Sequence, residues 1–326
     1  MKAVIYTRFG PPEVLQLGEA PKPAPKANDV LIRVHAATVC KEDPDMRSAP
    51  GFNGLLKPAH PILGQELAGE VEAVGPGVTR FRPGDQVFGI DNFGAYAEYK
   101  CMPESGALAL MPAGLSYAEA ASIPNGALTA LPFLRDHGRI RQGQAALIYG
   151  ASGSVGTAAV QLARAYGAEV TGVCSSANVD LVRSLGAGRV VDYTREDFTR
   201  LGQTYDIIFD AVGKLSFSRG RDRLARDGVY LTVVPGLDAL LHGLWASFAG
   251  GRQARFAATG LRSANRKADD LRFITGLIES GQFRAVIDRC YPMEQVAEAH
   301  RYVEEGHKKG NVVITMLVSK SGENEH

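Results

Sequence analysis

The sequence predicts an α/β protein of two domains, one built on a doubly wound parallel sheet and one rich in β strands. Strands alternate with helical periods over residues 113–285, which is typical of a parallel sheet with helices on both faces. Residues 1–112 instead carry short apolar runs between Gly and Pro turns, such as DVLIRVHAA and DQVFGI, and these indicate strands. A chain of 326 residues is long enough for two cores.

The last part of the chain is expected to return to the β domain. The segment YPMEQVAEAHRYVEEGHKKGNVVITM predicts one amphipathic helix and a final strand that has no partner of its own. We therefore expect residues 1–112 and 286–326 to form one domain and residues 113–285 to form the other.

Composition argues against two classes of partner. With 36 basic and 35 acidic side chains, the formal charge of +1 gives no field that would gather nucleic acid or an anionic membrane. The start, MKAVIYTRF, is typical of a strand rather than a signal segment, and no later stretch is apolar enough to span a bilayer. We therefore expect a cytoplasmic protein. Its cysteines form no CxxC pair and are expected to be reduced: Cys40, Cys101, Cys174 and Cys290.

A dinucleotide fingerprint lies in the stretch LIYGASGSVGTAAVQLARAYGAEVTGVCSS, residues 147–176. Such a site needs glycines for a tight turn, for backbone approach to pyrophosphate and for close packing of helix on strand. Ala151, Gly153 and Gly156 occupy those three positions, and Gly150 precedes the departure at Ala151. The following helix would point its free N–H groups and positive dipole end at phosphate. The expected cofactor contacts in this loop are Gly150, Ala151, Ser152, Gly153, Ser154, Val155 and Gly156.

The second strand of this unit ends on hydroxyls rather than on an acid. A cofactor with a bare ribose usually meets an Asp or Glu about 20 residues beyond the glycines, whereas Ser175 and Ser176 stand there and the first acid is Asp180. A carboxylate about 4 Å from a 2′-phosphate would repel it by about 4 kcal/mol at a surface-like dielectric, while hydroxyls donate hydrogen bonds. The sequence therefore predicts NADP(H). The residues expected at its 2′-phosphate are Ser175, Ser176, Tyr193 and either Arg183 or Arg195.

Three segments together resemble the medium-chain dehydrogenase/reductase superfamily. They are PILGQELAGEVEAVGPGVTRFRPGDQVFG at 61–89, the strand–glycine–helix–strand stretch at 145–174, and the closing HKKGNVVITM at 307–316. The resemblance implies a GroES-like β domain made from both chain ends, with a Rossmann domain between them. It also implies a small-molecule substrate and a homo-oligomer, for which we expect a dimer.

The metal ligands of that superfamily are not matched. A catalytic zinc needs three protein ligands and an open position. Cys40, in CKED, matches the first ligand of the family, but Gln65 stands where the family has histidine, and IPNGALTA at 123–130 offers no cysteine for the third. Glu66 could coordinate only as part of a weak site, and Cys101 is alone where a structural zinc lobe has four cysteines. We therefore expect a protein without zinc.

Without a Lewis acid, the chemistry expected is reduction of an activated alkene or quinone, because the acceptor itself delocalises the charge that hydride brings. This matches the zinc-free quinone oxidoreductase and enone reductase group that the sequence resembles. Cys40, where members often have Asn, and Asp43 are the candidate catalytic residues, and no proton donor is identified. The remaining cofactor contacts implied by the resemblance are Thr129, Gly213, Val233, Pro235 and Asn311.

Two other functions stay open on the sequence alone. An alcohol or aldehyde dehydrogenase would need a metal or a proton relay that the motifs do not supply. An NADPH-binding protein with a sensing or structural role would need only the cofactor site. Turnover of NADPH with quinones or enones separates these alternatives from the first.

Overall fold

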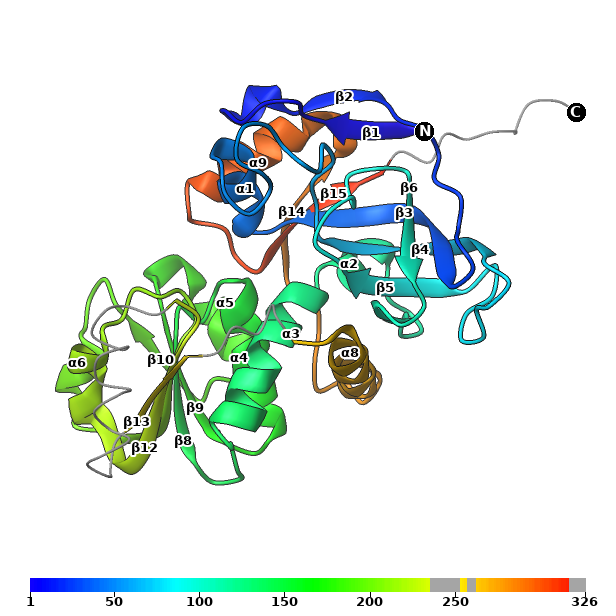
Figure 1. Cartoon of the computed structure of the whole chain (residues 1–326). Helices are drawn as coiled ribbons and strands as arrows, with labels where there is room; N and C mark the ends of the chain where they lie inside the picture. Colours follow the sequence, from blue (N-terminus) through cyan, green and yellow to red (C-terminus); the bar gives the residue numbers. More distant parts are fainter. Residues whose placement is uncertain (235–252, 257–261, 317–326) are drawn as a thin grey trace, which may run out of the picture. The chain divides into compact units, whose positions relative to one another are not determined.

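The computed structural model describes residues 1–234, 253–256 and 262–316, and it divides into two compact units (Figure 1). The first unit comprises Met1–Pro124, Ala264–Arg272 and the described residues from Ile287 onward; the second comprises the described residues within Asn125–Ser263, together with Phe273–Val286. The predicted α/β fold class, with one parallel sheet and one separate β domain, is confirmed. Among the described helices, none combines the length and the apolar composition that a bilayer crossing requires.

The first boundary between the two units follows Pro124, which is later in the chain than the predicted boundary at residue 112. Helix α2 (Tyr117–Ala121) contacts β3 (Asp29–Val39) and β4 (Glu66–Val74), so this stretch belongs to the β unit. Its start is fixed by a capping box, in which the side chains of Ser116 and Glu119 each bond the other's backbone N–H. Residues 264–272, which the prediction placed in the second domain, also group with the first unit.

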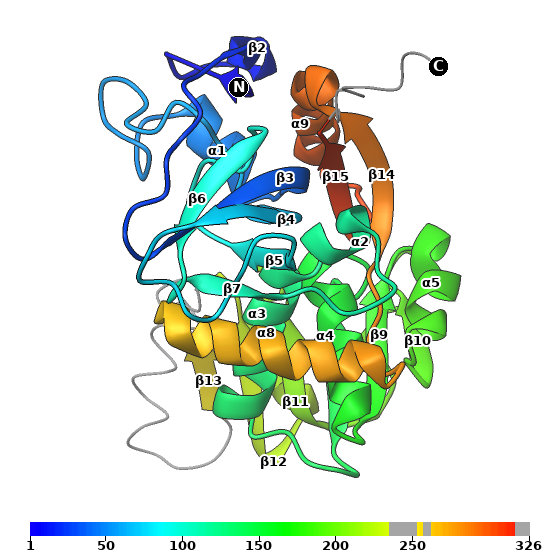
Figure 2. The same cartoon turned by 90° about the vertical axis from the view of Figure 1, so that its right-hand side faces the viewer.

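The first unit is built on a seven-stranded sheet. Its strand order is β14-β15-β3-β4-β5-β7, and β6 also pairs with β3. The remaining bounds are β5 (Gln86–Ile90), β6 (Tyr99–Pro103), β7 (Ala107–Leu110), β14 (Ile287–Pro292) and β15 (Asn311–Thr315). A separate hairpin pairs β1 (Lys2–Ile5) with β2 (Gln16–Glu19). Figure 2 shows β14, β15 and α9 (Val296–Glu304) together, as predicted for a C-terminal segment that joins the β domain.

The second unit is a six-stranded sheet in which every pair of neighbours is parallel. The order is β10-β9-β8-β11-β12-β13, so the chain reverses direction of travel across the sheet between β8 and β11. That reversal is the topological switch point at which open α/β sheets bind ligands. The strands are β8 (Ala145–Tyr149), β9 (Glu169–Cys174), β10 (Arg189–Asp192), β11 (Tyr205–Asp210), β12 (Leu224–Thr232) and β13 (Gln253–Phe256).

The α helices described in the second unit lie between its strands or before the first of them. They are α3 (Pro124–Pro132), α4 (Ser154–Ala165), α5 (Val179–Ser184) and α6 (Phe217–Gly220), while α8 (Ala264–Glu279) runs across the division between the units. One core cluster packs apolar residues of β8, β9, β10, β11 and β12 together, among them Leu147, Val173, Val191, Ile208 and Tyr230.

Helix α4 packs against the sheet at a distance that only glycine permits. A Cβ added to Gly156 would overlap the carbonyl oxygen of Gly150 and would lie 2.8 Å from the Cα of Ala151. The same holds on β9, where a Cβ at Gly172 would overlap the side chain of Val182. Backbone atoms cannot move aside as a side chain can, so Gly156 sets how closely the helix approaches the turn after β8.

We expect Gly156→Ala to lower the free energy of unfolding by about 1–3 kcal/mol, because the new methyl group forces helix and turn apart. The matched control is Gly276→Ala in α8, where an added Cβ meets nothing within 4 Å. That change removes only the conformational freedom of glycine and is expected to raise stability by about 0.5–1 kcal/mol. Urea denaturation measures both, and a Gly156→Ala protein as stable as the wild type would contradict the close-packing argument.

Candidate cofactor and active site

The turn after β8 depends on Gly150 rather than on the residue that follows it. Gly150 has a left-handed backbone (φ +78°), and its N–H and that of Ala151 donate to the carbonyl of Val173 on β9 at 3.1 and 3.0 Å. The side chain of Ala151 is fully buried. The alanine at the first fingerprint position therefore needs no unusual backbone angle, because the residue before it makes the turn.

The N-terminus of α4 presents N–H groups to the loop. Gly153 is the N-cap, and the first helical hydrogen bond runs from Thr157 N–H to the carbonyl of Gly153 at 2.8 Å. The N–H groups of Ser154, Val155 and Gly156 precede it and find no acceptor within the described part of the chain. The hydroxyl of Ser154 is also buried without a partner there. Unpaired donors of this kind fit the pyrophosphate of a dinucleotide.

The loops after β8 and β9 are joined by a buried amide. Asn178 donates from Nδ2 to the hydroxyls of Ser152 at 3.1 Å and Ser175 at 3.2 Å. Its Oδ1 is buried and has no partner among the described residues. The predicted residues Ser152 and Ser175, which are far apart in the sequence, are thus brought together at the carboxyl edge of the sheet. Sequence reasoning missed Asn178, whose only signal was its place two residues after the predicted serine pair.

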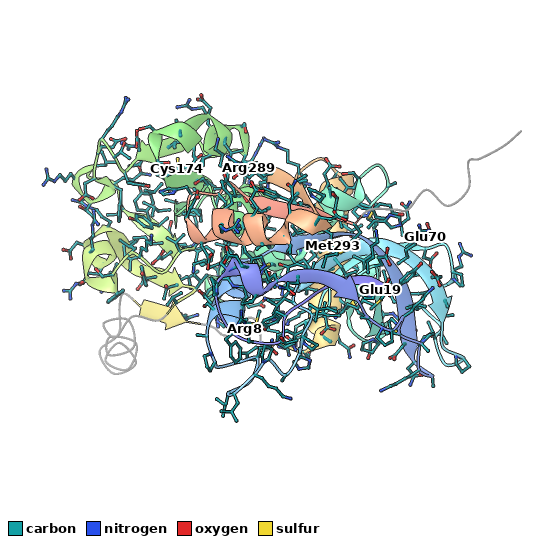
Figure 3. The ribbon with its side chains drawn as sticks, turned by 90° about the horizontal axis from the view of Figure 1, so that it is seen from above. Arg8, Glu19, Glu70, Cys174, Arg289 and Met293 are labelled. Carbon is teal, nitrogen blue, oxygen red and sulfur yellow. The ribbon has the colours of Figure 1, made fainter. Side chains whose placement is uncertain are left out.

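A carboxylate stands beside the second serine. Asp192 ends β10 opposite Cys174, which ends β9 and is labelled in Figure 3. The hydroxyl of Ser176 donates to Asp192 Oδ2 and lies 2.9 Å from that of Thr194. This hydrogen bond is the largest cause that lowers the pKa of Asp192. Along the chain, Asp180 is the first acid after the serines. Asp192 comes later in the chain and lies beside Ser176 only because β10 pairs with β9, so the sequence did not predict it.

The arginines offered for the 2′-phosphate differ in their partners. Arg195 lies 3.5 Å from Asp192 Oδ2, whereas Arg183 pairs with Asp180 at 3.3 Å. Tyr193 follows β10 and is largely exposed. The structure therefore brings Ser176, Tyr193 and Arg195 to one place and leaves Arg183 on its own helix.

The loop after β11 is fixed by a second buried carboxylate. Asp210, fully buried, accepts from the N–H groups of Val212 at 3.1 Å, Gly213 at 2.9 Å and Leu215 at 2.8 Å. Gly213 has φ +71°, and a Cβ there would lie 2.5 Å from Cβ of Val234. Asp210 was not predicted from the sequence, although it stands three residues before the predicted glycine.

Three other residues were predicted to contact the cofactor: Val233, Thr129 and Pro235. Val233 follows β12, and its N–H donates to the carbonyl of Asp210 at 3.2 Å. Thr129 lies on α3 and is partly buried. Pro235 falls outside the described residues.

In the β unit, the candidate Asp43 is a fully buried carboxyl at the start of α1 (Glu42–Ser48). Its Oδ2 accepts from the N–H of Cys40 at 2.8 Å and from the hydroxyl of Tyr96 at 3.1 Å. Its Oδ1 has no partner among the residues that the structure describes. Burial is the main cause that raises the pKa of Asp43 to about 7. Asp43 is thus a buried group and not a solvated one, although it lies in the charged run KEDPD.

The thiol of Cys40 faces another buried acid. Cys40 Sγ lies 3.1 Å from Glu66 Oε2, and the hydroxyl of Thr38 donates to the same oxygen. Burial, and then the charge of Glu66, raise the pKa of the thiol well above its usual value. Cys40 is therefore protonated at neutral pH. Within the described ranges, no group of three or more His, Cys, Asp or Glu side chains could hold a metal ion.

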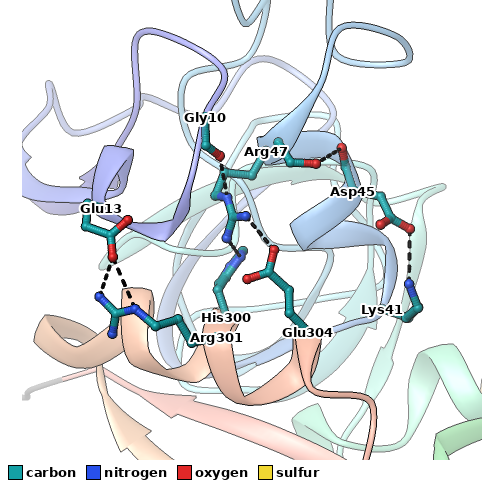
Figure 4. A network of polar contacts seen from close by, with 9 residues as sticks. Gly10, Glu13, Lys41, Asp45, Arg47, His300, Arg301 and Glu304 are labelled. Atoms are coloured by element: carbon teal, nitrogen blue, oxygen red, sulfur yellow. Dashed lines mark hydrogen bonds and ion pairs between the residues drawn. The ribbon is translucent and has the colours of Figure 1, made fainter.

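Helix α1 is held at its other end by an ion pair between a buried arginine and a partly exposed glutamate (Figure 4). Arg47 is 1% exposed and bonds Glu304 of α9 at 2.6 Å and the carbonyl of Gly10 at 3.0 Å. Its Nη1 lies 3.4 Å from Nδ1 of His300, whose pKa is lowered to about 3 by burial and by the arginine charge. His300 also packs edge-on against Tyr96, with ring centroids 5.9 Å apart. Arg47 and His300 thus fix α1 and support the tyrosine that bonds Asp43.

Asn311 begins β15, which pairs with β3 so that Val312 stands opposite Val39. The predicted contact Asn311 therefore lies on the strand beside the end of β3, where Cys40 follows. The structure thus brings together the predicted residues of the β unit, Cys40, Asp43 and Asn311.

Known proteins match this chain along nearly its whole length. Family models match residues 26–132 as an alcohol dehydrogenase GroES-like domain and residues 185–314 as a zinc-binding dehydrogenase. An NADPH-dependent alkenal/one oxidoreductase of Arabidopsis thaliana chloroplasts is 32% identical, covering 96% of this chain and 79% of that protein. The structure of the Coxiella burnetii quinone oxidoreductase has a TM-score of 0.84 at 32% identity, covering 97% of this chain and 99% of the other. The Escherichia coli quinone oxidoreductase complexed with NADPH has a TM-score of 0.83 at 25% identity, covering 97% and 100%.

The chain therefore belongs to the medium-chain dehydrogenase/reductase superfamily, as the three matching segments predict. Within that superfamily it falls in the quinone oxidoreductase-like branch. The predicted pairing of a GroES-like domain with a Rossmann domain is confirmed as well.

Asp43→Asn tests the buried carboxyl. Because its pKa of about 7 in the folded protein exceeds the ordinary value of 3.8, the wild-type free energy of unfolding should fall as pH rises from about 4 to 7. At about 1.4 kcal/mol per pKa unit, the loss is at most about 4 kcal/mol. Asparagine keeps an acceptor for Cys40 N–H but does not ionise, so the variant should lack this loss.

Urea midpoints of both proteins between pH 4 and 8 measure the difference. The control is Asp45→Asn on the same helix, where the side chain is 70% exposed and the expected change is below about 0.5 kcal/mol at every pH. Parallel curves for the wild type and Asp43→Asn would show that the carboxyl titrates normally.

Proposed function

We propose that this chain uses NADPH to reduce small quinones or α,β-unsaturated carbonyl compounds, and that it does so without a metal ion. The observation that carries the proposal is the match over 96% of the chain to an NADPH-dependent alkenal/one oxidoreductase. The oxidoreductase and NADP(H) predictions are confirmed by such relatives and by a related structure that contains NADPH.

The cluster around Cys40 supports chemistry without zinc. Cys40 is the one residue here that matches a zinc ligand of the family, and its thiol contacts Glu66. The neighbouring position is the neutral amide of Gln65. The zinc-binding dehydrogenase model matches residues 185–314 and so does not include either residue. A reductase of electron-poor alkenes needs no Lewis acid, whereas an alcohol dehydrogenase would.

Some of these residues would bind the cofactor, and others hold the loops that surround it. The reduced nicotinamide supplies a hydride when the cofactor is bound. The N–H groups at the start of α4 fit its pyrophosphate, and the group of Ser176, Tyr193 and Arg195 fits the 2′-phosphate. Asp210 fixes the loop that carries Gly213, and Asp43 fixes the backbone of Cys40. A homodimer and a cytoplasmic location stay predictions.

We expect the purified protein to oxidise NADPH in the presence of a quinone or an enone, and not in the presence of an alcohol with NADP. Absorbance at the nicotinamide band measures turnover over a panel of both acceptor classes and of simple alcohols. Treatment with a strong chelator should leave the rate unchanged. Turnover with alcohols alone, or loss of activity on chelation with recovery on adding zinc, would favour the alcohol dehydrogenase function. Tight NADPH binding without turnover of any acceptor would favour a binding protein.

Ser176→Asp should weaken NADPH binding relative to NADH by at least about tenfold. The new carboxylate would stand beside Asp192 and repel the 2′-phosphate by up to about 4 kcal/mol, reduced by solvent at this exposed position. Titration of cofactor fluorescence measures both dissociation constants.

Arginine variants test the same 2′-phosphate site by removing a positive charge instead of adding a negative one. Arg195→Gln should weaken NADPH selectively, while Arg183→Gln, whose arginine pairs with Asp180, should not. An unchanged preference in Ser176→Asp would place the 2′-phosphate elsewhere.

A further inference from the structure

Lys308 lies in the turn between α9 and β15. Its ammonium donates to the carbonyl of Gly310 at 2.7 Å, and Gly310 has a left-handed backbone (φ +52°) that turns the chain into β15. Because β15 is antiparallel to β3, with Val312 opposite Val39, the turn before β15 lies beside the residues that follow β3. Those residues begin with Cys40. Lys308 is thus a cation at the edge of the Cys40 and Glu66 cluster.

The charges around Lys308 come from each element packed near it. Burial of the ammonium lowers its pKa, and the opposing contributions come from Cys40 after β3, Glu66 of β4, Glu42 of α1 and Asp288 of β14. Burial is the larger effect. Among these acids, Asp288 already accepts from the hydroxyl of Tyr302 at 2.6 Å and from the N–H of Lys309 at 3.0 Å.

The ammonium keeps free donors. A lysine ammonium carries three N–H bonds, and Gly310 accepts one of them. Neither a carboxylate within 4 Å nor a second acceptor for Lys308 occurs among the described residues. The residue as a whole is partly exposed, although its ammonium is buried. A cation with free N–H bonds beside a predicted reaction centre needs a chemical explanation.

We propose that Lys308 is a catalytic residue, which stabilises the oxyanion of the reduced substrate and gives it the proton that completes the reaction. This inference rests on the proposed function. It supplies the proton donor that the motifs do not identify.

The step balances for both substrate classes. The hydride that bound NADPH would supply, with its own oxidation to NADP⁺, adds two electrons and one hydrogen to the β-carbon of an enone. The carbon–carbon π pair moves toward the carbonyl, and the oxygen of the resulting enolate carries the negative charge. One N–H bond of the Lys308 ammonium then breaks, its proton bonds the enolate, and a neutral amine remains until solvent reprotonates it. For a quinone, the hydroquinone monoanion takes the same proton.

Other acids near the predicted site are less suited to this role. Tyr96 and Asp43 are both fully buried and hydrogen-bonded to each other, and the pKa of Tyr96 is raised well above its usual value. Cys40 is 6% exposed, faces Glu66 and has a raised pKa. Lys308 alone in this set combines N–H donors without a partner among the described residues, a residue that is partly exposed, and a pKa lowered from its ordinary value.

The test compares Lys308→Met with Lys309→Met, which alters the exposed neighbouring lysine in the same turn. We expect Lys308→Met to lower kcat for an enone by about 100-fold, the effect typical of a lost general acid, with the NADPH dissociation constant unchanged within about twofold. Lys309→Met should keep the wild-type kcat. Lys308→Arg, which keeps the charge but holds its proton, should fall between the two.

Two further measurements distinguish a catalytic role of Lys308 from a purely structural one. Wild-type kcat should fall as pH rises through the pKa of Lys308, because the ammonium is the active form, and Lys308→Met should lack this fall. Independently of turnover, acetylation of the cofactor-free protein followed by mass spectrometry should show Lys308 becoming reactive at a lower pH than Lys309.

Each outcome decides the proposal. A kcat of Lys308→Met within threefold of that of Lys309→Met, or equal labelling midpoints for the two lysines, would overturn the assignment of Lys308 while leaving the proposed function intact. If the wild-type protein reduces neither quinones nor enones, the proposed function fails and this inference fails with it.

Discussion

The buried carboxyl of Asp43 is the constraint on which the geometry of the β unit's candidate site depends. It bonds Cys40 N–H at 2.8 Å and the Tyr96 hydroxyl at 3.1 Å, and so ties the end of β3, the start of α1 and the strand-rich core to one atom. A charged carboxyl at this depth is costly, which is why its pKa moves to about 7. A helix as short as α1 is not stable alone, so these bonds and Arg47 at its other end hold it in place.

In the Rossmann unit, the loops of the candidate cofactor site are positioned by several separate contacts. The loop after β8 is placed by backbone contacts, because Gly150 turns the chain and Gly156 lets the helix approach, whereas the loop after β11 is fixed by the buried carboxylate of Asp210. Small side-chain caps then fix the flanking loops, with Asn178 joining two serines and Asp210 accepting three N–H groups. The donors left over at the start of α4 are the ones that an anionic cofactor can use.

Features of the fold that depend on local sequence patterns were predicted correctly. Strand and helix alternation gave the parallel sheet, and the glycine spacing located the turn, although the role assigned to position 151 belongs to Gly150. The sequence could not predict contacts made across strands. Asp192 and Cys174 are far apart in the chain and meet only because β10 lies beside β9. Likewise, Arg47 and His300 look like ordinary surface residues until α1 and α9 bury them together.

Asp192 also changes how discrimination between NADPH and NADH is understood. Its carboxylate accepts from the hydroxyls of Ser176 and Thr194, from Thr194 N–H at 3.0 Å, and pairs with Arg195 at 3.5 Å. A carboxylate with this many donors is better compensated than a bare one, so it repels a nearby phosphate less than its formal charge suggests. Ser176 and Arg195 can also turn from Asp192 to a phosphate oxygen, since both are exposed and both donate. If the 2′-phosphate binds at the site we propose, preference for NADPH would depend on the competition between two anions for the same donors, and not on the absence of an acid.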